Sequence, residues 1–116
     1  MKKAFTLPTC KTCQRIFEDL KPAENGCEVI DIKANGISAE DLDRMAELTG
    51  SYEALFSRRA MKFRSMGLAD QNLAESDYRR LILEEYTFLK RPVFLFDDAV
   101  AAGSAKVAVE AARKLL

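Results

Sequence analysis

Histidine is absent from this chain of 116 residues, and cysteine occurs only three times, as Cys10, Cys13 and Cys27. Without histidine, no imidazole is available as a general base. Zinc favours cysteine and histidine ligands, so a closed four-ligand zinc site would need a carboxylate or a second chain. Chemistry that depends on an imidazole is therefore excluded, and a nucleophilic cysteine would need another source of activation.

The sequence also lacks an excess of charge and any long hydrophobic run. Its 18 basic and 18 acidic residues give a net charge of 0, which does not favour binding to nucleic acid or to a membrane surface. No segment approaches the length of a transmembrane helix, and the uncharged stretch after Lys3 is too short and too polar for a secretory signal. We therefore expect a cytoplasmic protein with no membrane partner and no direct nucleic-acid partner.

Hydrophobic residues make up 48% of the chain, which is enough for a single domain over residues 1–116. Apolar runs and helical spacing predict four strands and four helices. The strands are expected at 2–7, 27–32, 92–96 and 99–102, and the helices at 10–21, 38–49, 75–89 and 105–116, with a short helical piece at 52–56. The order, βαβ, then a helical insert over about 38–89, then ββα, predicts an α/β fold with a mixed four-stranded sheet.

Two of these helices have more detailed signatures. Residues 38–41 (SAED) resemble a capping box, because an acidic residue follows a serine by three positions. The last helix is expected to bury one apolar face, formed by Val107, Ala108, Ala111, Ala112 and Leu115.

A pair of cysteines lies where the first strand is expected to meet the first helix, in residues 8–13 (PTCKTC). Backbone N–H groups in the first turn of a helix have no partner within the helix, and they favour negative charge. A thiolate at Cys10, the reactive form of cysteine, would be stabilised there. Cys13 follows by three positions and shares the same face of the helix, close enough for a disulfide. The pattern indicates a dithiol redox site.

Three other interpretations of the pair remain at this point. Cys10 and Cys13 could form half of a zinc site, since zinc favours this spacing. They could be small buried hydrophobic residues, which is common for free cysteine. They could also form a structural disulfide, although such bonds are rare in a reducing compartment.

Residues 57–67 (SRRAMKFRSMG) carry four cations and no acidic residue. The absence of acids predicts a positive field that nothing compensates locally. The plainer interpretation is a solvated, charged loop.

Six short segments, in order and spread over almost the whole chain, resemble the arsenate reductase/Spx family, a branch of the thioredoxin fold. They are residues 8–13 (PTCKTC), 29–33 (VIDIK), 38–42 (SAEDL), 55–59 (LFSRR), 67–68 (GL) and 90–93 (KRPV). The resemblance implies a thioredoxin-like fold with a helical insert. It also implies a cis peptide bond before Pro92, with the proline facing the active-site cysteine.

In arsenate reductases of this type, the cysteine that matches Cys10 is the nucleophile, and it attacks the arsenic of a bound oxyanion. The resemblance implies that Arg91 binds this oxyanion and stabilises the thiolate, together with Arg59 or, as second choice, Arg58. The third arginine of the family lies near the end of the fourth strand. Residues 100–103 (VAAG) contain no arginine, so we expect weak arsenate reduction.

Cys13 matches a cysteine of Spx-type regulators, which sense oxidants by disulfide formation and bind the RNA polymerase α-subunit. We expect an arsenate-reductase-like thiol oxidoreductase in which Cys13 is the resolving thiol. It would bind no cofactor and would take electrons from a thiol reductant, either glutathione with glutaredoxin or thioredoxin. Its partners would be a small oxyanion such as arsenate and a thiol donor protein, and the chain would be a monomer. The alternative is a disulfide-switched transcriptional regulator that binds the RNA polymerase α-subunit.

Plainer roles are open for the remaining site candidates. Arg91 could form a surface ion pair with Glu84 or Glu85, and the arginines of residues 58–59 could be solvated surface charges, as arginine usually is. Cys27 is expected to be a buried strand residue.

Overall fold

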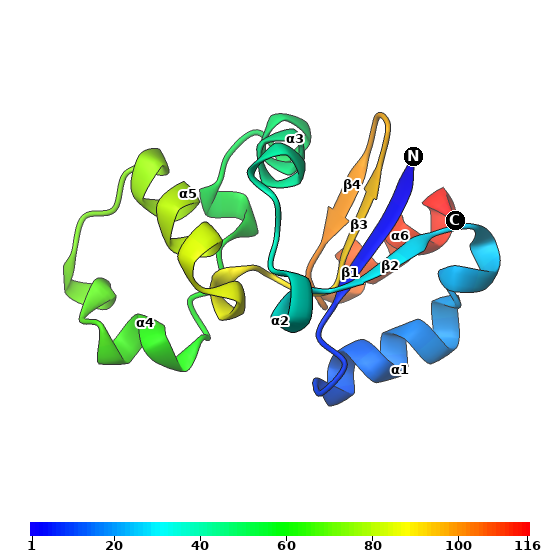
Figure 1. Ribbon diagram of the computed structural model, residues 1–116, viewed down its shortest axis with the longest axis horizontal. Helices are drawn as coiled ribbons and strands as arrows, with labels where there is room; N and C mark the ends of the chain where they lie inside the picture. Colours follow the sequence, from blue (N-terminus) through cyan, green and yellow to red (C-terminus); the bar gives the residue numbers. More distant parts are fainter. The chain divides into compact units, whose positions relative to one another are not determined.

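Both ends of the chain contribute to one four-stranded sheet in the computed structural model, which describes residues 1–116 (Figure 1). The strands are β1 (Lys2–Thr6), β2 (Glu28–Asp31), β3 (Val93–Phe96) and β4 (Val100–Ala102), in the spatial order β2-β1-β3-β4. β1 pairs parallel with β2 and antiparallel with β3, and β3 and β4 form an antiparallel hairpin. The mixed four-stranded sheet predicted from the sequence is therefore confirmed.

The chain forms two compact units. The first comprises Met1–Gly36 and Arg91–Leu116, and it holds the sheet with α1 (Lys11–Leu20), η1 (Ala23–Asn25), α2 (Ile32–Asn35) and α6 (Lys106–Leu115). The second, Ile37–Lys90, contains only helices. No helix in either unit combines the length and apolarity that a membrane span requires.

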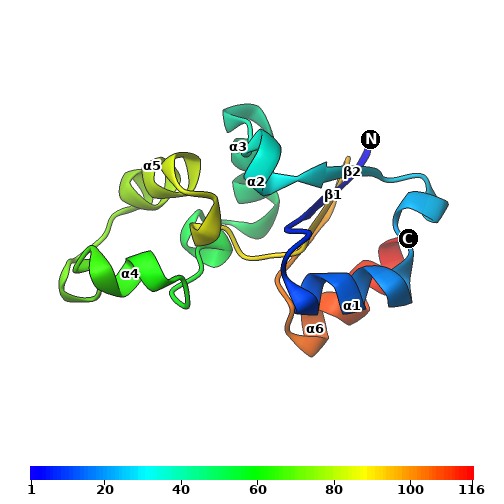
Figure 2. The same ribbon diagram turned by 60° about the horizontal axis from the view of Figure 1, so that its bottom comes forward.

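Helices α1 and α6 cover the same face of the sheet (Figure 2). Ala4, Phe94 and Ala101 lie in one row across β1, β3 and β4, so their side chains point to that face. Ile16 of α1 and Ala112 of α6 belong to the same buried cluster. Because one face of each helix is apolar, packing both against this row removes that surface from water.

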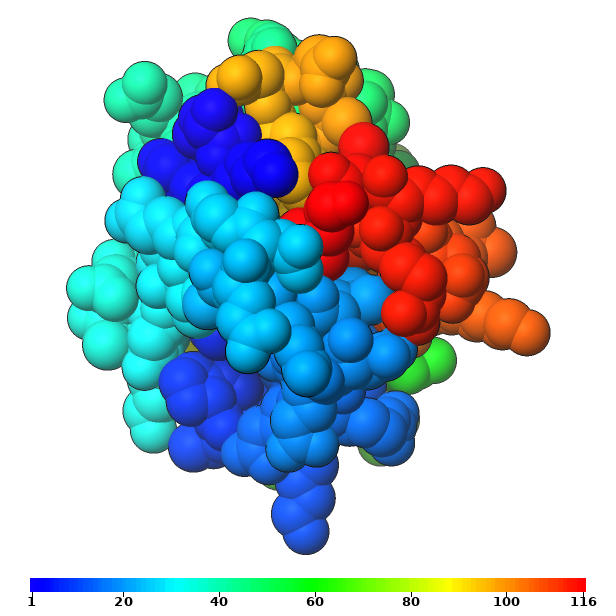
Figure 3. Space-filling view, turned by 90° about the vertical axis from the view of Figure 1, so that its right-hand side faces the viewer, coloured from blue at the N-terminus to red at the C-terminus, as the bar shows by residue number.

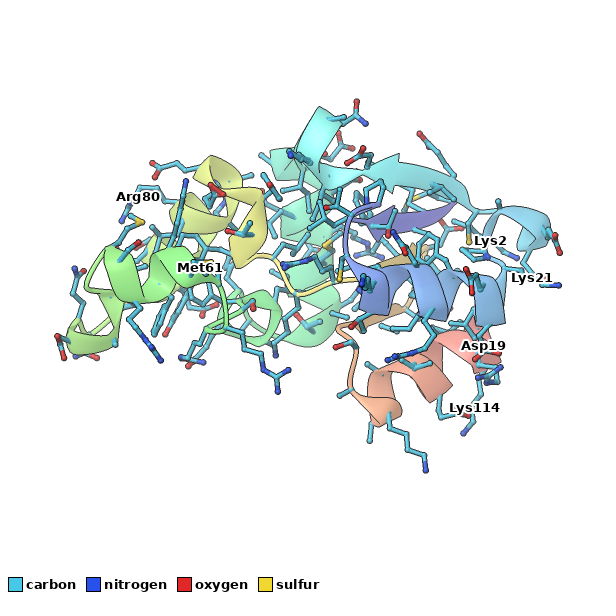
Figure 4. The ribbon with its side chains drawn as sticks, turned by 90° about the horizontal axis from the view of Figure 1, so that it is seen from below. Lys2, Asp19, Lys21, Met61, Arg80 and Lys114 are labelled. Atoms are coloured by element: carbon cyan, nitrogen blue, oxygen red, sulfur yellow. The ribbon has the colours of Figure 1, made fainter.

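The two helices run side by side in the same direction (Figures 1 and 2). Near their C-terminal ends, the Arg113 guanidinium donates to the Asp19 carboxylate at 2.6 Å. Asp19 lies between α1 and α6 (Figure 4). The side chains of α1 and α6 adjoin on the surface of this unit (Figure 3).

The prediction that Val107 belongs to the buried face of α6 is wrong. Its side chain is 83% exposed, and Val109 packs against the core instead. Val107 precedes the buried Ala112 by five positions, which places it about 140° away around the helix. The rest of the predicted face is largely correct: Ala112 is buried, and Ala111 and Leu115 pack against the same core together with Val109 and Leu116.

The expected second strand, residues 27–32, is shorter at both ends. Its last residue, Ile32, instead begins α2, because the Asp31 carboxylate accepts hydrogen bonds from the N–H groups of Lys33 and Ala34 at 2.9 and 3.2 Å. These bonds satisfy two backbone N–H groups at the start of the helix, which have no partner within the helix itself.

The second unit consists of α3 (Ala39–Thr49), η2 (Glu53–Leu55), α4 (Met61–Ser65), η3 (Leu68–Asp70), α5 (Glu75–Glu84) and η4 (Tyr86–Phe88). Its core contains Phe56, whose ring stacks on Phe88 and meets the edges of Tyr78 and Phe63. The capping box predicted for α3 is confirmed at its serine, since the Ser38 hydroxyl accepts from the Asp41 N–H at 3.1 Å. Arg79 of α5 binds Asp43 of α3 at 2.8 Å, which ties the two helices together.

The expected helix at 75–89 ends earlier, at Glu84, because Glu85 adopts an extended backbone with φ −139 and ψ 110. The chain beyond it pairs with the segment around Phe56. The Phe88 carbonyl accepts from the Ser57 N–H at 2.7 Å, and the Lys90 N–H donates to the Leu55 carbonyl at 2.8 Å. Leu89, between the two bonding positions, has extended backbone with φ −80 and ψ 130, so these contacts override the helical spacing of the sequence.

Candidate functional site

Cys10 occupies the position immediately before α1. Its backbone is extended, with φ −85 and ψ 114, and its carbonyl accepts from the Gln14 N–H at 3.0 Å, which starts the helix. Its own N–H donates to the Leu7 carbonyl at 2.9 Å, which ties the turn to the end of β1. The side chain is partly exposed. The thiol is thus held beside the unpartnered N–H groups of the first helical turn, as the sequence predicts.

The Cys10 thiol has a lowered pKa. Partial burial acts against this shift, but hydrogen bonds from the N–H and the thiol of Cys13 and from the N–H of Thr12 stabilise the thiolate, and the positive charge of Arg91 adds to them. Together the donors outweigh burial, so the Cys10 pKa lies below its ordinary value. Cys10 therefore carries a larger fraction of the reactive thiolate than an ordinary cysteine at the same pH.

Cys13 has the opposite character. Its side chain is fully buried, at 0% exposure. Burial raises its pKa, and so does its hydrogen bond to Cys10, while donors from the Leu7 N–H and the Thr6 hydroxyl act in the other direction. Cys13 therefore stays protonated, and its S–H group donates a hydrogen bond to the Cys10 sulfur. The pair is a thiolate with a hydrogen-bonded thiol behind it.

Arg91 belongs to the same unit as the two cysteines and is half-buried. Its charge acts on the Cys10 sulfur. The Arg91–Pro92 peptide bond is cis, which confirms the expectation from the resemblance. The Pro92 carbonyl accepts from the Gly103 N–H at 2.8 Å, so the end of β4, where the family's third arginine is expected, lies next to this segment.

The two candidate arginines of the basic segment belong to the second unit. Arg58 is engaged there, because its guanidinium donates to the Glu53 carboxylate at 2.7 Å and to the Tyr78 hydroxyl at 3.0 Å. Arg59 is exposed, and no hydrogen bond or ion pair engages its guanidinium. The structure therefore brings Cys10, Cys13 and Arg91 together in one unit and distinguishes Arg59 from Arg58 in the other.

The positive field predicted over residues 57–67 is partly compensated, so that prediction is wrong. Acids from other segments supply the missing charge: Glu53 pairs with Arg58, and Glu85 pairs with Lys62, each at 2.7 Å. The segment is also not a continuous loop, since α4 forms over part of it. The acids considered for Arg91 pair with other cations, Glu84 with Arg80 and Glu85 with Lys62.

Cys27 lies apart from the pair, immediately before β2, and is buried in the cluster beneath α1 and α6. Burial raises the pKa of its thiol. The prediction that it is buried is confirmed. No three His, Cys, Asp or Glu side chains gather where they could hold a metal ion.

Sequence reasoning missed the donors that set the properties of the cysteine pair. Thr6 is a buried polar residue at the end of β1, and its hydroxyl reaches the Cys13 sulfur. A threonine beside apolar Ala4 and Phe5, at the buried end of the strand, was the available signal. The hydrogen bonds from the N–H groups of Leu7 and Thr12 leave no signal in the sequence, because every residue except proline has an N–H group and only the backbone conformation directs it to a sulfur.

The chain matches the model of the ArsC family over residues 5–112. It matches no curated protein. Among solved structures, it resembles an arsenate reductase from Vibrio cholerae with a TM-score of 0.81 and 17% identity, covering 99% of this chain and 97% of that one. It also resembles an arsenate reductase (ArsC) related protein from Brucella melitensis with a TM-score of 0.69 and 25% identity, covering 95% of this chain and 92% of that one.

Proposed function

Because the chain belongs to the ArsC family, we propose that it is a thiol-dependent reductase of a small oxyanion such as arsenate, with Cys10 as nucleophile and Cys13 as resolving thiol. The observation that carries the proposal is the cysteine pair. Cys10 has a lowered pKa, and the two largest contributions that lower it come from the N–H and the thiol of Cys13. A nucleophile and its second reactant are thereby preassembled.

In the first step, the Cys10 thiolate attacks the arsenic of arsenate. A bond forms between sulfur and arsenic, and one arsenate oxygen leaves as water after it is protonated. Arg91 favours this step in two ways. Its charge stabilises the thiolate, and a guanidinium offers a fork of N–H donors that suits a tetrahedral oxyanion.

In the second step, Cys13 loses its proton and attacks the Cys10 sulfur. A disulfide forms, the sulfur–arsenic bond breaks, and its electron pair stays on arsenic, which is reduced from As(V) to As(III). Burial protects Cys13 from solvent reagents until this point, because its side chain is 0% exposed. The pKa of its thiol is raised in the resting state, mainly by burial and partly by the Cys10 charge, so Cys13 stays protonated until it attacks.

Arg59 rather than Arg58 is assigned as the second oxyanion ligand. Arg58 already donates to Glu53 and Tyr78, and breaking these bonds would cost free energy before the oxyanion could bind. Arg59 has no such bonds to lose. This assignment predicts that Arg59→Ala weakens oxyanion binding more than Arg58→Ala.

The cycle closes when a thiol reductant restores the two cysteines. Two electrons are needed for each disulfide, and either a dithiol protein or two molecules of glutathione can supply them. No bound cofactor takes part in these steps.

The test is to incubate the purified chain with arsenate, measure arsenite release, and map the cysteines by mass spectrometry. One equivalent of arsenite should appear without any reductant, with a Cys10–Cys13 bond and a free Cys27. Cys10→Ser should release none, and Cys13→Ser should release none until glutathione is added. Cys27→Ala is the matched control and should behave as the wild type. Arsenite release by Cys10→Ser would contradict the proposal.

A second candidate function rests on the same pair. Because the two sulfurs are already hydrogen-bonded, an oxidant alone can close the disulfide, and the chain would then be a redox switch that binds the RNA polymerase α-subunit. A pull-down with the reduced and the oxidised chain distinguishes the two. Redox-dependent binding of RNA polymerase together with no arsenite release would favour the regulator.

A further inference from the structure

A valine in the first turn of α6 is exposed to solvent. Val107 is 83% exposed, and among the large hydrophobic side chains only Met61 is more exposed. Pro8, which precedes the cysteine motif, is also exposed. An apolar side chain on the surface gains free energy when a partner covers it, so these two positions are candidates for an interface.

The first turn of α6 lies at the same end of the molecule's first unit as Cys10. The helices α1 and α6 run parallel (Figures 1 and 2), and Asp19 is paired with Arg113 across them. Equal rise per residue therefore places Cys13 level with Val107. Both helices cover the same face of the sheet (Figure 2), so a protein that reaches the Cys10 sulfur also meets the start of α6.

This end of the unit also carries exposed positive charge. Lys11 and Lys106 are the first residues of α1 and α6, and neither helix has an acidic residue in its first turn. Both lysines are exposed, and neither forms an ion pair. Lys106 precedes Arg113 by seven positions, so it lies on the side of α6 that faces α1. A partner with acidic groups would gain attraction here without displacing an existing bond.

We propose that Pro8, Lys11, Lys106 and Val107 form a docking surface for a protein dithiol reductant whose own cysteines are surrounded by acidic and apolar side chains. The inference rests on the proposed function, in which Cys10 and Cys13 form a disulfide that must be reduced. Such a reductant has to approach Cys10, because Cys13 is fully buried. The docking surface is what it meets beside that sulfur.

The electron transfer that this contact serves is a disulfide exchange. A thiolate of the reductant attacks the Cys10 sulfur, a mixed disulfide forms, and Cys13 leaves as a thiolate that takes up a proton. The second thiol of the reductant then attacks its own partner sulfur, which releases Cys10 and leaves the reductant oxidised. Two electrons and two protons pass to the chain, and no other reactant is needed.

The experiment measures how fast the oxidised chain is reduced by thioredoxin, which its NADPH-dependent reductase keeps reduced, and separately by dithiothreitol. Oxidation is first verified by mass spectrometry, because forming one disulfide removes two hydrogen atoms from the chain. A chain that forms no disulfide disproves the proposed function before docking is tested. Lys106→Glu and Val107→Asp should each lower kcat/KM for thioredoxin by about tenfold or more, as interface substitutions of this kind do. Reduction by dithiothreitol, which needs no docking, should stay unchanged.

Two matched variants control for charge and polarity alone. Lys114→Glu makes the same change near the other end of α6, where Lys114 lies beyond Arg113 (Figure 4). Val29→Asp makes the same change at another exposed valine, on β2. Both should be reduced by thioredoxin at the wild-type rate. Equal effects of the control and test variants, or equal losses with dithiothreitol, would overturn the docking surface.

Salt provides an independent readout. Attraction between the lysines and an acidic partner should weaken as ionic strength rises, so the wild-type rate with thioredoxin should fall with added salt. For Lys106→Glu this dependence should be smaller. A rate that is independent of salt in the wild type would contradict the electrostatic part of the proposal.

Discussion

At the scale of single residues, two cysteines three positions apart have opposite acid–base properties. Cys10 is partly exposed and receives hydrogen bonds from two backbone N–H groups and from a thiol, whereas burial dominates at Cys13. The difference arises because the first lies outside the helix and the second lies inside its first turn, against the sheet. This difference sets the order of the proposed reaction: the Cys10 thiolate attacks first, and the buried Cys13 thiol then forms the disulfide with it.

We predict that Cys10 is the first cysteine to be alkylated by iodoacetamide. The reagent reacts with the thiolate, whose fraction rises with pH, so a lowered pKa moves the reaction of Cys10 to lower pH. The raised pKa values of Cys13 and Cys27 move theirs to higher pH, and burial slows both further. Limited labelling over a pH series, read by peptide mass spectrometry, checks the order. Faster labelling of Cys13 or Cys27 would show that the assignment of the nucleophile is wrong.

Arg91→Ala should raise the pKa of Cys10, because the variant removes a positive charge that favours the thiolate. The ultraviolet absorbance of the thiolate, followed during a pH titration of the Cys13→Ser, Cys27→Ala background, reports this pKa. Arg91→Lys keeps the charge and is the matched control, so its titration should stay closer to that of the parent. A titration that does not move in Arg91→Ala would exclude an electrostatic role for this residue.

At the scale of elements, short polar caps decide where helices begin. The Ser38 hydroxyl satisfies the Asp41 N–H at the start of α3, and the Asp31 carboxylate satisfies two donors at the start of α2. The serine and the acid three positions later predict the first cap. The second cap could not be predicted in this way, because residues 27–32 are rich in β-branched side chains that favour a strand.

Ser38→Ala should destabilise the fold by about 1 kcal/mol, the usual cost of losing such a cap. Urea unfolding followed by circular dichroism gives this free energy. Ser76→Ala in α5 is the control. Ser76 is exposed and its hydroxyl takes no part in a cap, so its stability should change by less than about 0.5 kcal/mol. Equal stability of Ser38→Ala and wild type would mean that water replaces the cap without loss.

At the scale of the whole molecule, the set of oxyanion ligands is smaller than the family resemblance implies. Residues 100–103 contain no arginine. Arg58 and Lys62, the cations that could replace it, are already paired with Glu53 and Glu85. Fixed hydrogen-bond donors that stabilise the charge developing in the transition state are a large part of catalysis, and the loss of one donor lowers the rate.

We therefore predict that arsenate turnover is slower by about 10²–10³ than in a family member with all three arginines, since this is the typical effect of losing one donor. Steady-state arsenite production, measured beside such an enzyme under the same conditions, checks this. The rate should persist with a dithiol reductant in place of glutathione, because Cys13 releases the product. Turnover as fast as in the three-arginine enzyme would show that another group supplies the missing charge.

Local features could be predicted from the sequence alone: the order of the four strands and the longer helices, the strand-to-helix position of the cysteine pair, and the cap of α3. Each depends on contacts between residues a few positions apart, and a local pattern encodes these directly. The mixed sheet could also be predicted, because an intervening helix requires parallel neighbours and a tight turn requires antiparallel ones.

The contacts between these elements depend on the folded structure and could not be predicted from the sequence. The tertiary structure ended α5 at Glu84 to pair Phe88 with Ser57, turned Val107 outward, and paired Arg58 and Lys62 with distant acids. It also placed the Arg91 charge where it acts on the Cys10 sulfur, although the two are far apart in the chain. Such contacts join residues with no fixed spacing, and their free energies depend on burial and distance, which appear only once the chain has folded.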